Sequence, residues 1–136
     1  MSPITIYSNE YATLWFHPEH KIVHHKFHKF VYSEAFRNVL SRGLNQMKEQ
    51  GATKWLSDDR FNSALTPEDG AWAMQEWGPK VIEAGWKAWA IVLPESFLGR
   101  MNMKEYIDIY AKQGVTVELF SDPDEALEWL KSLEES

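Results

Sequence analysis

Apolar and polar positions alternate in three short segments near the amino terminus, a pattern typical of β-strands. The segments cover residues 4–7, 11–16 and 21–31, and turn-forming residues separate them at 8–10 and 17–20. The second and third segments are expected to form a hairpin. Neither face of residues 21–31 is cleanly apolar, because histidines and lysines fall on both faces. We therefore expect an edge strand whose charges discourage pairing with another molecule.

Beyond residue 32 the apolar spacing changes to three and four residues, which indicates helices that alternate with strands. The first helix is expected to begin with Ser33 as its N-cap and to end at Gly51 in a left-handed conformation. Thr66-Pro67-Glu68-Asp69 predicts a second helix start, since it combines a capping hydroxyl, a proline and a carboxylate three residues on. Pro79 should kink this helix or begin a new segment. The remaining predicted elements are strands at 52–57, 86–93 and 115–120, a helix at about 102–113, and a last helix capped at 121–125.

This order of elements predicts a single α/β domain that covers residues 1–136. Strands joined through helices run parallel with right-handed crossovers, whereas the amino-terminal hairpin strands are antiparallel. The sheet is therefore expected to be mixed and layered with helices. A length of 136 residues fits one domain, and no repeat or linker divides the chain.

Composition excludes several classes of protein. With 44% hydrophobic and 14% aromatic residues, including seven tryptophans, the chain can bury a sizeable core. The absence of cysteine excludes disulfides and thiolate chemistry. A net charge of −6 argues against nucleic acid as the main partner. No secretory signal is evident, and the longest apolar run, Ala88–Leu93, is too short to span a membrane. We therefore expect a soluble cytoplasmic protein, not an integral membrane protein.

The three charged residues after the central strand are the leading functional candidate. In α/β sheets, ligands and partners usually meet the protein at the carboxyl ends of the strands. The predicted contact surface for a protein partner consists of Asp58, Asp59, Arg60, Asn62 and Thr66. The alternative is structural: Asp58 caps the loop, and Arg60 pairs with a carboxylate to fix the strand-to-helix connection.

The tryptophans suggest a second hypothesis. Trp72, Trp77, Trp86 and Trp89 lie close together in the sequence, and core packing accounts for most of them. An aromatic pocket for an apolar or lipid-like ligand, between the tryptophan-rich helix and the sheet, is the other interpretation. Its predicted lining is Trp72, Trp77, Trp89, Phe97 and Met101.

All five histidines, at positions 17, 20, 24, 25 and 28, fall within the predicted hairpin. Metal binding is disfavoured, because the adjacent His24 and His25 point to opposite faces, and His24 and His28 are about 13 Å apart along a strand. We expect a solvated, titratable edge instead. Protonation of all five near pH 6 would take the net charge from −6 to −1, so solubility should fall on mild acidification.

Catalysis and cofactor binding have little support. The sequence lacks a glycine-rich phosphate loop, a nucleophile elbow and a His-Glu-x-x-His motif. A hydrolase-like activity at Asp58 and Arg60 is the weakest of the three functional hypotheses. The sequence thus predicts a protein without cofactor, metal or catalytic residues.

One resemblance to a known family covers roughly residues 30 to 133. The pattern that carries it consists of Trp77-Gly78-Pro79, Ala84-Gly85, Lys87, Ala90-Ile91-Val92, Pro94, Val117, Phe120, Glu125-Ala126 and Trp129-Leu130. With these positions, the second half of the chain resembles the STAS-like family, which groups bacterial anti-sigma-factor-antagonist-like domains with CRAL-TRIO-type lipid-binding relatives. These are core and turn positions, so the resemblance speaks to fold more than to activity.

The resemblance implies a non-catalytic regulatory or protein-interaction module. In the sigma-factor antagonists, a phosphorylatable serine follows an aspartate at the end of the central strand. Asp58 matches the aspartate, and Asp59 occupies the serine position, which departs from the pattern. A fixed carboxylate there would imitate a phosphoserine only in part, since it carries less charge and fewer acceptors. The hairpin edge and the many tryptophans are also compatible with a homodimer.

Overall fold

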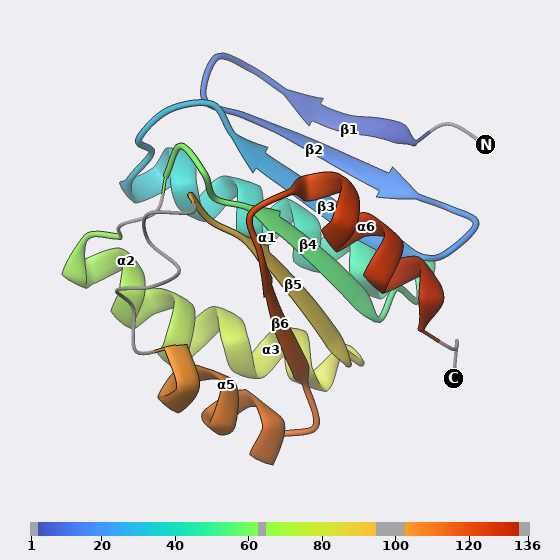
Figure 1. Cartoon of the computed structure of the whole chain (residues 1–136). Helices are drawn as coiled ribbons and strands as arrows, with labels where there is room; N and C mark the ends of the chain where they lie inside the picture. The colour runs from blue at the N-terminus through green and yellow to red at the C-terminus, as the bar shows by residue number, and fades with distance from the viewer. Residues whose placement is uncertain (1–2, 63–64, 95–102, 134–136) are drawn as a thin grey trace.

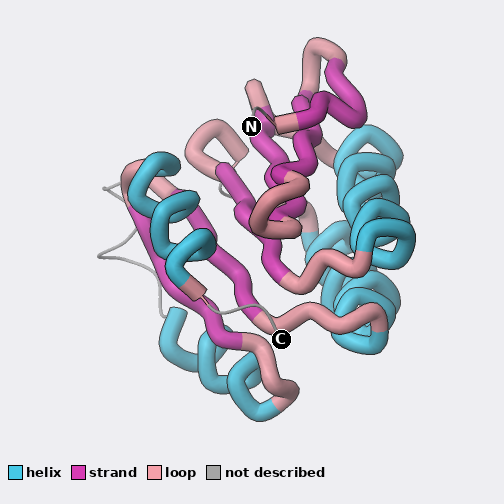
Figure 2. Tube along the Cα trace, turned by 90° about the vertical axis from the view of Figure 1, so that its right-hand side faces the viewer, coloured by secondary structure: helices cyan, strands magenta, loops and turns pink. Residues whose placement is uncertain are grey.

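The computed structural model of the chain describes residues 3–62, 65–94 and 103–133. A six-stranded sheet forms the central layer, and helices lie on both of its faces (Figures 1 and 2). Its strands are β1 Ile4–Ser8, β2 Ala12–His17, β3 Ile22–Phe27, β4 Lys54–Asp58, β5 Ala88–Val92 and β6 Thr116–Phe120. The helical segments are α1 Ser33–Gln50, α2 Pro67–Trp72, the π-helical turn η1 Ala73–Trp77, α3 Gly78–Glu83, α5 Met103–Lys112 and α6 Pro123–Ser132.

The strands lie side by side in the order of the sequence, β1 to β6. The first three pair antiparallel, and β3 to β6 pair parallel, which confirms the predicted mixed α/β sheet. When successive parallel strands are neighbours and every crossover is right-handed, the connecting helices must share one face. Accordingly α1, α3 and α5 pack on one face, whereas α6, which follows the last strand, packs on the other over β4, β5 and β6.

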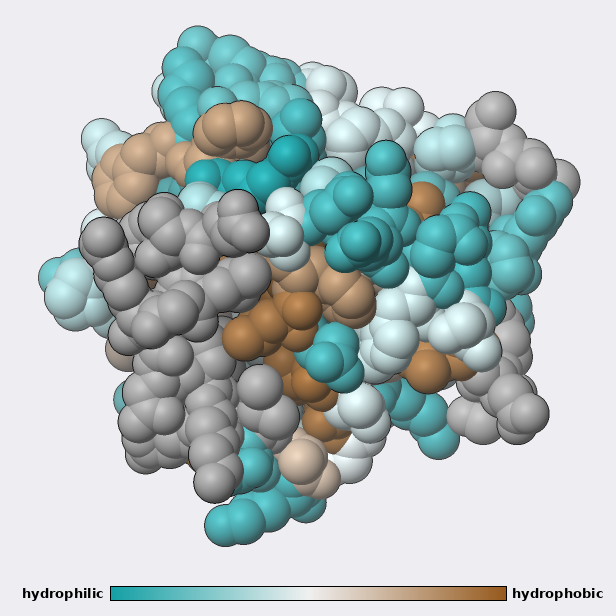
Figure 3. Space-filling model, in the orientation of Figure 1, coloured by the Kyte–Doolittle hydropathy of each residue, from teal (hydrophilic) through white to brown (hydrophobic). Residues whose placement is uncertain are grey.

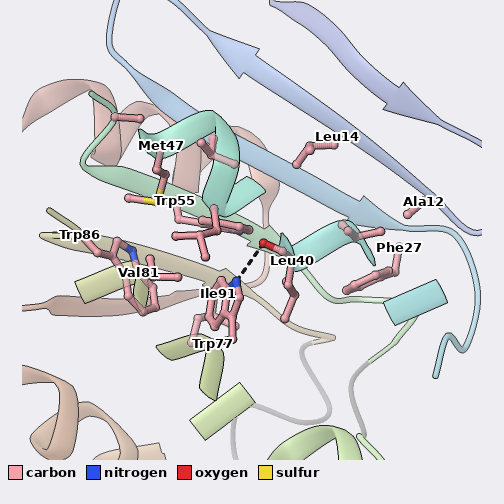
Figure 4. Close-up of a cluster of buried hydrophobic side chains, with 14 of the residues drawn as sticks. Ala12, Leu14, Phe27, Leu40, Met47, Trp55, Trp77, Val81, Trp86 and Ile91 are labelled. Carbon is pink, nitrogen blue, oxygen red and sulfur yellow. Dashed lines mark hydrogen bonds between the residues drawn. The ribbon is translucent and has the colours of Figure 1, made fainter. Parts of the chain in front are cut away.

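The larger core lies between the sheet and the connecting helices. Three tryptophans occupy its centre: Trp55 from β4, Trp77 from the end of η1, and Trp86 before β5 (Figure 4). Trp77 stands edge-on to Trp55 and to Trp86, with ring centroids 5.2 and 5.6 Å apart. Its indole Nε1–H donates to the carbonyl oxygen of Leu40 in α1 at 2.8 Å (Figure 4). The tryptophans therefore tie α1, η1 and the sheet together.

The prediction that residues 21–31 form an edge strand is wrong. The strand β3 lies third in the sheet and pairs with β2 on one side and β4 on the other. It is also shorter than predicted and ends at Phe27. Its polar residues are not a sign of solvent, because His25 is only 3% exposed and forms hydrogen bonds within the core.

The true edges of the sheet are β1 and β6. Figure 3 shows apolar residues gathered in a strip over β6, between α5 and α6, with hydrophilic residues around much of it. The strand buries Val117 and leaves Leu119 and Phe120 half-buried. The histidine-bearing strands β2 and β3 thus lie inside the sheet, not at either edge.

Three of the four predicted helix caps agree with the structure, the cap of α6 by Asp122 among them. Thr66 caps α2, since its hydroxyl accepts a hydrogen bond from the Asp69 amide at 3.2 Å, and Gly51 ends α1 at φ 67°. Ser33 is not the N-cap of α1; Tyr32 takes that position without a side-chain bond. The amide of Ser33 instead donates to the Asp69 carboxylate at 2.8 Å, so a residue of α2 supplies the cap from a distance.

The expected break at Pro79 takes the form of a widened turn. Proline has no N–H to donate back along the helix. Just before it, the amide of Gly78 reaches the carbonyl of Ala73, and η1 joins α2 to α3 through this π-helical turn. None of the helices in the described part of the chain combines the length and apolar character needed to cross a bilayer.

Candidate functional site: a pocket at the carboxyl ends of β4 and β5

A pocket of about 270 Å³ lies on the face of the sheet that the connecting helices cover. Most of its wall is apolar and comes from the sheet, α1 and η1. The apolar lining includes Phe27, Phe36, Leu40, Trp77, Trp89 and Ile91. Four polar residues also face it, namely His25, Ser57, Asp59 and Asn62. Such a composition, mostly apolar with a few polar groups, is typical of small-molecule sites.

Strand alternation explains why these residues share the pocket. Successive side chains of a strand point to opposite faces, so Trp55, Ser57 and Asp59 follow one face of β4 and its continuation. The register pairs Ser57 with His25 on β3 and with Ile91 on β5. The same rule sends Asp58 to the opposite face, beneath α6.

His25 connects the core to the pocket through two hydrogen bonds. The indole Nε1–H of Trp55 donates to His25 Nδ1 at 2.9 Å, and His25 Nε2 lies 2.8 Å from Asp59 Oδ1. Because an indole N–H can only donate, Nδ1 must accept, and the ring proton resides on Nε2. His25 therefore donates to the Asp59 carboxylate and orients it, and neither ring nitrogen is left to take a proton from a substrate.

A tight turn places Asp59 and Asn62 next to each other. The amide of Asn62 donates to the Asp59 carbonyl oxygen at 3.2 Å, across a four-residue turn. The Asn62 side chain is 3% exposed, and its Oδ1 accepts a hydrogen bond from the Val31 amide at 3.1 Å. Within the described residues, Asn62 Nδ2 is the single buried side-chain nitrogen or oxygen without a hydrogen-bond partner. Buried polar groups are nearly always satisfied, so this nitrogen, in a residue that lines the pocket, makes the turn a candidate binding site.

The five residues of the predicted partner surface do not lie together. Asp58 is 2% exposed on the α6 face, where both of its carboxylate oxygens accept from the Arg60 guanidinium at 2.8 Å. The hydrogen bond from this guanidinium to Asp58 raises the pKa of Arg60. Asp59 and Asn62 face the pocket instead, and Thr66 caps α2. The structural alternative for Asp58 and Arg60 thus matches their geometry.

The predicted ligand-binding tryptophans fall into two groups. Trp77 and Trp89 line the pocket, and the indole Nε1–H of Trp89 donates to Ser57 Oγ at 2.8 Å. Trp72 is not in the lining; its ring stands against Phe36, with the Arg37 guanidinium above it. Phe97 and Met101 lie outside the described residues.

The histidines do not form the solvated edge that the sequence predicts. His17 and His24 stack on the α6 side of the sheet with ring centroids 5.3 Å apart, and His17 Nε2 lies 3.1 Å from His24 Nδ1. Burial, and then the neighbouring His17 and His25, lower the pKa of His24 to about 3. Burial also lowers the pKa of His17. The prediction that all five protonate near pH 6 is therefore wrong. The residues that the structure describes contain no group of metal-binding side chains, either there or elsewhere.

Sequence reasoning missed His25 and Ser57 as pocket residues. Both carried a usable signal, since each is a polar residue on the apolar side of a buried strand. His25 lies two residues after Val23, and Ser57 lies two residues after Trp55. The contributions of α1, η1 and α5, such as Phe36, Ala73 and Tyr110, depend on how the helices pack and had no local signal.

Comparisons with known proteins leave the family open. No protein-family model matches the chain, and neither the curated proteins nor the solved structures give a match. The STAS-like resemblance therefore stays a prediction.

Proposed function

We propose that this chain is a non-catalytic binding protein for a small, largely apolar molecule held in the pocket between η1 and the sheet. The observation that carries the proposal is the combination of an apolar pocket of about 270 Å³ with the unpartnered Nδ2 of Asn62. An apolar cavity of about 150 Å³ accepts benzene. The pocket therefore suits a ligand of roughly two fused rings or a ring with a short chain.

Two features favour binding over catalysis. Both nitrogens of His25 are engaged, by Trp55 and by Asp59, so the imidazole is a fixed support for the carboxylate. Ser57 accepts a hydrogen bond from Trp89, and no general base that would activate its hydroxyl is bonded to it among the described residues. Nucleophilic catalysis depends on such a base.

Filling the pocket tests the proposal. Ala73 lines it from η1, so Ala73→Phe should occupy the ligand's space, whereas Ala71→Leu changes an exposed position two residues away. Equilibrium dialysis with naphthalene, and native mass spectrometry for a co-purified ligand, would compare both variants with the wild type. The proposal predicts binding to the wild type and to Ala71→Leu, and its loss in Ala73→Phe. Equal binding to all three proteins, or to none, would overturn it.

A second candidate, contact with a protein partner, is favoured by exposed apolar residues near the same end of the sheet. Phe30, Tyr32, Phe61 and Leu65 are 43–59% exposed and belong to the loops after β3 and β4. Single large apolar side chains on a surface are common, whereas a group of them marks interaction sites. This role would be supported by a protein partner that binds to the wild type and to Ala73→Phe but not to Phe61→Ser. Capture by all three would exclude these loops as the contact surface.

A further inference from the structure

The polar end of the pocket has the properties of a recognition site for one chemical group. Asp59 Oδ1 accepts from His25, which leaves the carboxylate with further acceptor capacity at its other oxygen. Three residues on, Asn62 Nδ2 is a buried donor without a partner among the described residues, while its Oδ1 accepts from the Val31 amide. Asp59 and Asn62 thus line the pocket from the two ends of one turn.

We propose that the ligand is an uncharged molecule of about two fused rings bearing a hydroxyl group, which donates to Asp59 and accepts from Asn62. This proposal rests on the proposed function and specifies its ligand. A hydroxyl can donate and accept at once, so it can satisfy both residues. A purely apolar ligand would leave the Asn62 nitrogen buried without a partner, which is costly.

Charge argues against an anionic ligand such as a fatty acid. The described lining of the pocket contains the Asp59 carboxylate and no lysine or arginine. His25 does not supply a positive charge, since its Nδ1 already accepts from the Trp55 indole and could not also carry a proton. A ligand carboxylate would meet Asp59 at short range in an apolar wall, where like charges repel strongly.

The rest of the wall selects for flat rings. Phe36, Trp77, Trp89 and Tyr110 all face the pocket, and the Trp89 and Tyr110 rings stand at 78° to each other. Aromatic side chains favour edge-to-face and offset-stacked neighbours. A planar bicyclic body fits both this wall and the volume.

Three probes of one shape separate the alternatives: 2-naphthol, naphthalene and 2-naphthoate. Equilibrium dialysis against the wild-type protein should rank 2-naphthol about tenfold tighter than naphthalene, the size of one buried hydrogen-bonded group, with 2-naphthoate weakest. Naphthalene that binds as tightly as 2-naphthol would overturn the hydroxyl assignment and leave the proposed function standing. Failure of all three probes to bind would overturn both. The tightest binding by 2-naphthoate would overturn the charge argument.

Two variants assign the effect to the named residues. Asn62→Asp keeps the oxygen that Val31 binds and replaces the free donor with an acceptor, so it should remove the advantage of 2-naphthol over naphthalene. Asp59→Asn keeps an oxygen for His25 and removes the charge, so 2-naphthoate should bind at least about tenfold better than to the wild type. Circular dichroism would check that both variants are folded. Folded variants that rank the probes as the wild type does would refute the roles of Asp59 and Asn62.

Discussion

Substitution of Gly43, in the middle of α1, should have a clear effect on the stability of the protein. A Cβ added to this glycine would overlap Cη2 of Trp55 and would lie 2.8 Å from two further atoms of the same ring. Gly43 therefore allows the indole to pack directly on the helix backbone. The substitution Gly43→Ala tests how firmly Trp55 is fixed.

Two opposing effects decide the sign of the result. Alanine in a helix interior is more favourable than glycine by about 0.5–1 kcal/mol. Overpacking a well-filled core costs about 1–3 kcal/mol. Trp55 has little freedom to move, since it is completely buried, donates to His25 and contacts Trp77. We therefore expect Gly43→Ala to lower the free energy of unfolding by about 1–2 kcal/mol, and to weaken ligand binding through the displaced His25.

Gly70→Ala is the matched control. Gly70 lies in α2, does not need a positive φ, and would place an added methyl group where no other atom lies within 4 Å. Only the gain in helix propensity applies there, so this variant should be more stable than the wild type by about 0.5–1 kcal/mol. Urea unfolding followed by circular dichroism would measure both. A Gly43→Ala protein as stable as the wild type would refute the close packing of Trp55 against α1.

Three further substitutions test the polar groups outside the pocket. Arg60→Met should lower the free energy of unfolding by about 3 kcal/mol, because it leaves Asp58 buried without its cation, yet it should spare 2-naphthol binding in dialysis. Asp69→Asn should lower the free energy of unfolding by about 2 kcal/mol at pH 7. Burial acts to raise the pKa of Asp69, but the bonds from Ser33 and Arg37 outweigh it and lower that pKa. The contribution of Asp69 to the free energy of unfolding is therefore complete above about pH 4 and is lost as the pH falls further. Urea titrations should show the difference between the wild type and Asp69→Asn shrinking in acid. His24→Gln should reduce the fall of the free energy of unfolding below about pH 6.5. With the His24 pKa lowered to about 3, the wild type loses up to about 1.4 kcal/mol of this free energy per pH unit there, because the unfolded state takes up the proton. Identical slopes in the two proteins would contradict the lowered pKa of His24.

Most of the fold that the sequence predicted rests on local signals. The cap at Thr66, the left-handed Gly51 and the alternation of helices with parallel strands all depend on neighbouring residues, and all are present. The edge assignment of residues 21–31 failed for the opposite reason. The partners that allow His25 to be buried, Asp59 and Trp55, are 34 and 30 residues away in the sequence.

The pocket was predictable only in part. Its place at the carboxyl end of a central strand followed from the fold class. Asp58 and Asp59 do not share one site, because consecutive strand residues point to opposite faces. The same alternation separates His24 from His25. The cap of α1 by Asp69 and the lining from η1 arise from the packing of distant helices, for which a single sequence carries no pattern.

The indole N–H signals of the seven tryptophans provide the most direct test of ligand binding in the pocket. Single Trp→Phe variants would assign them in a proton–nitrogen correlation spectrum, and 2-naphthol would then be titrated into the wild type. Trp77 and Trp89 line the pocket, whereas Trp15 and Trp129 lie on the α6 side of the sheet. The account predicts saturable shifts of the Trp77 and Trp89 signals, with those of Trp15 and Trp129 unmoved. Shifts confined to Trp15 or Trp129, or no shift at any tryptophan, would contradict it.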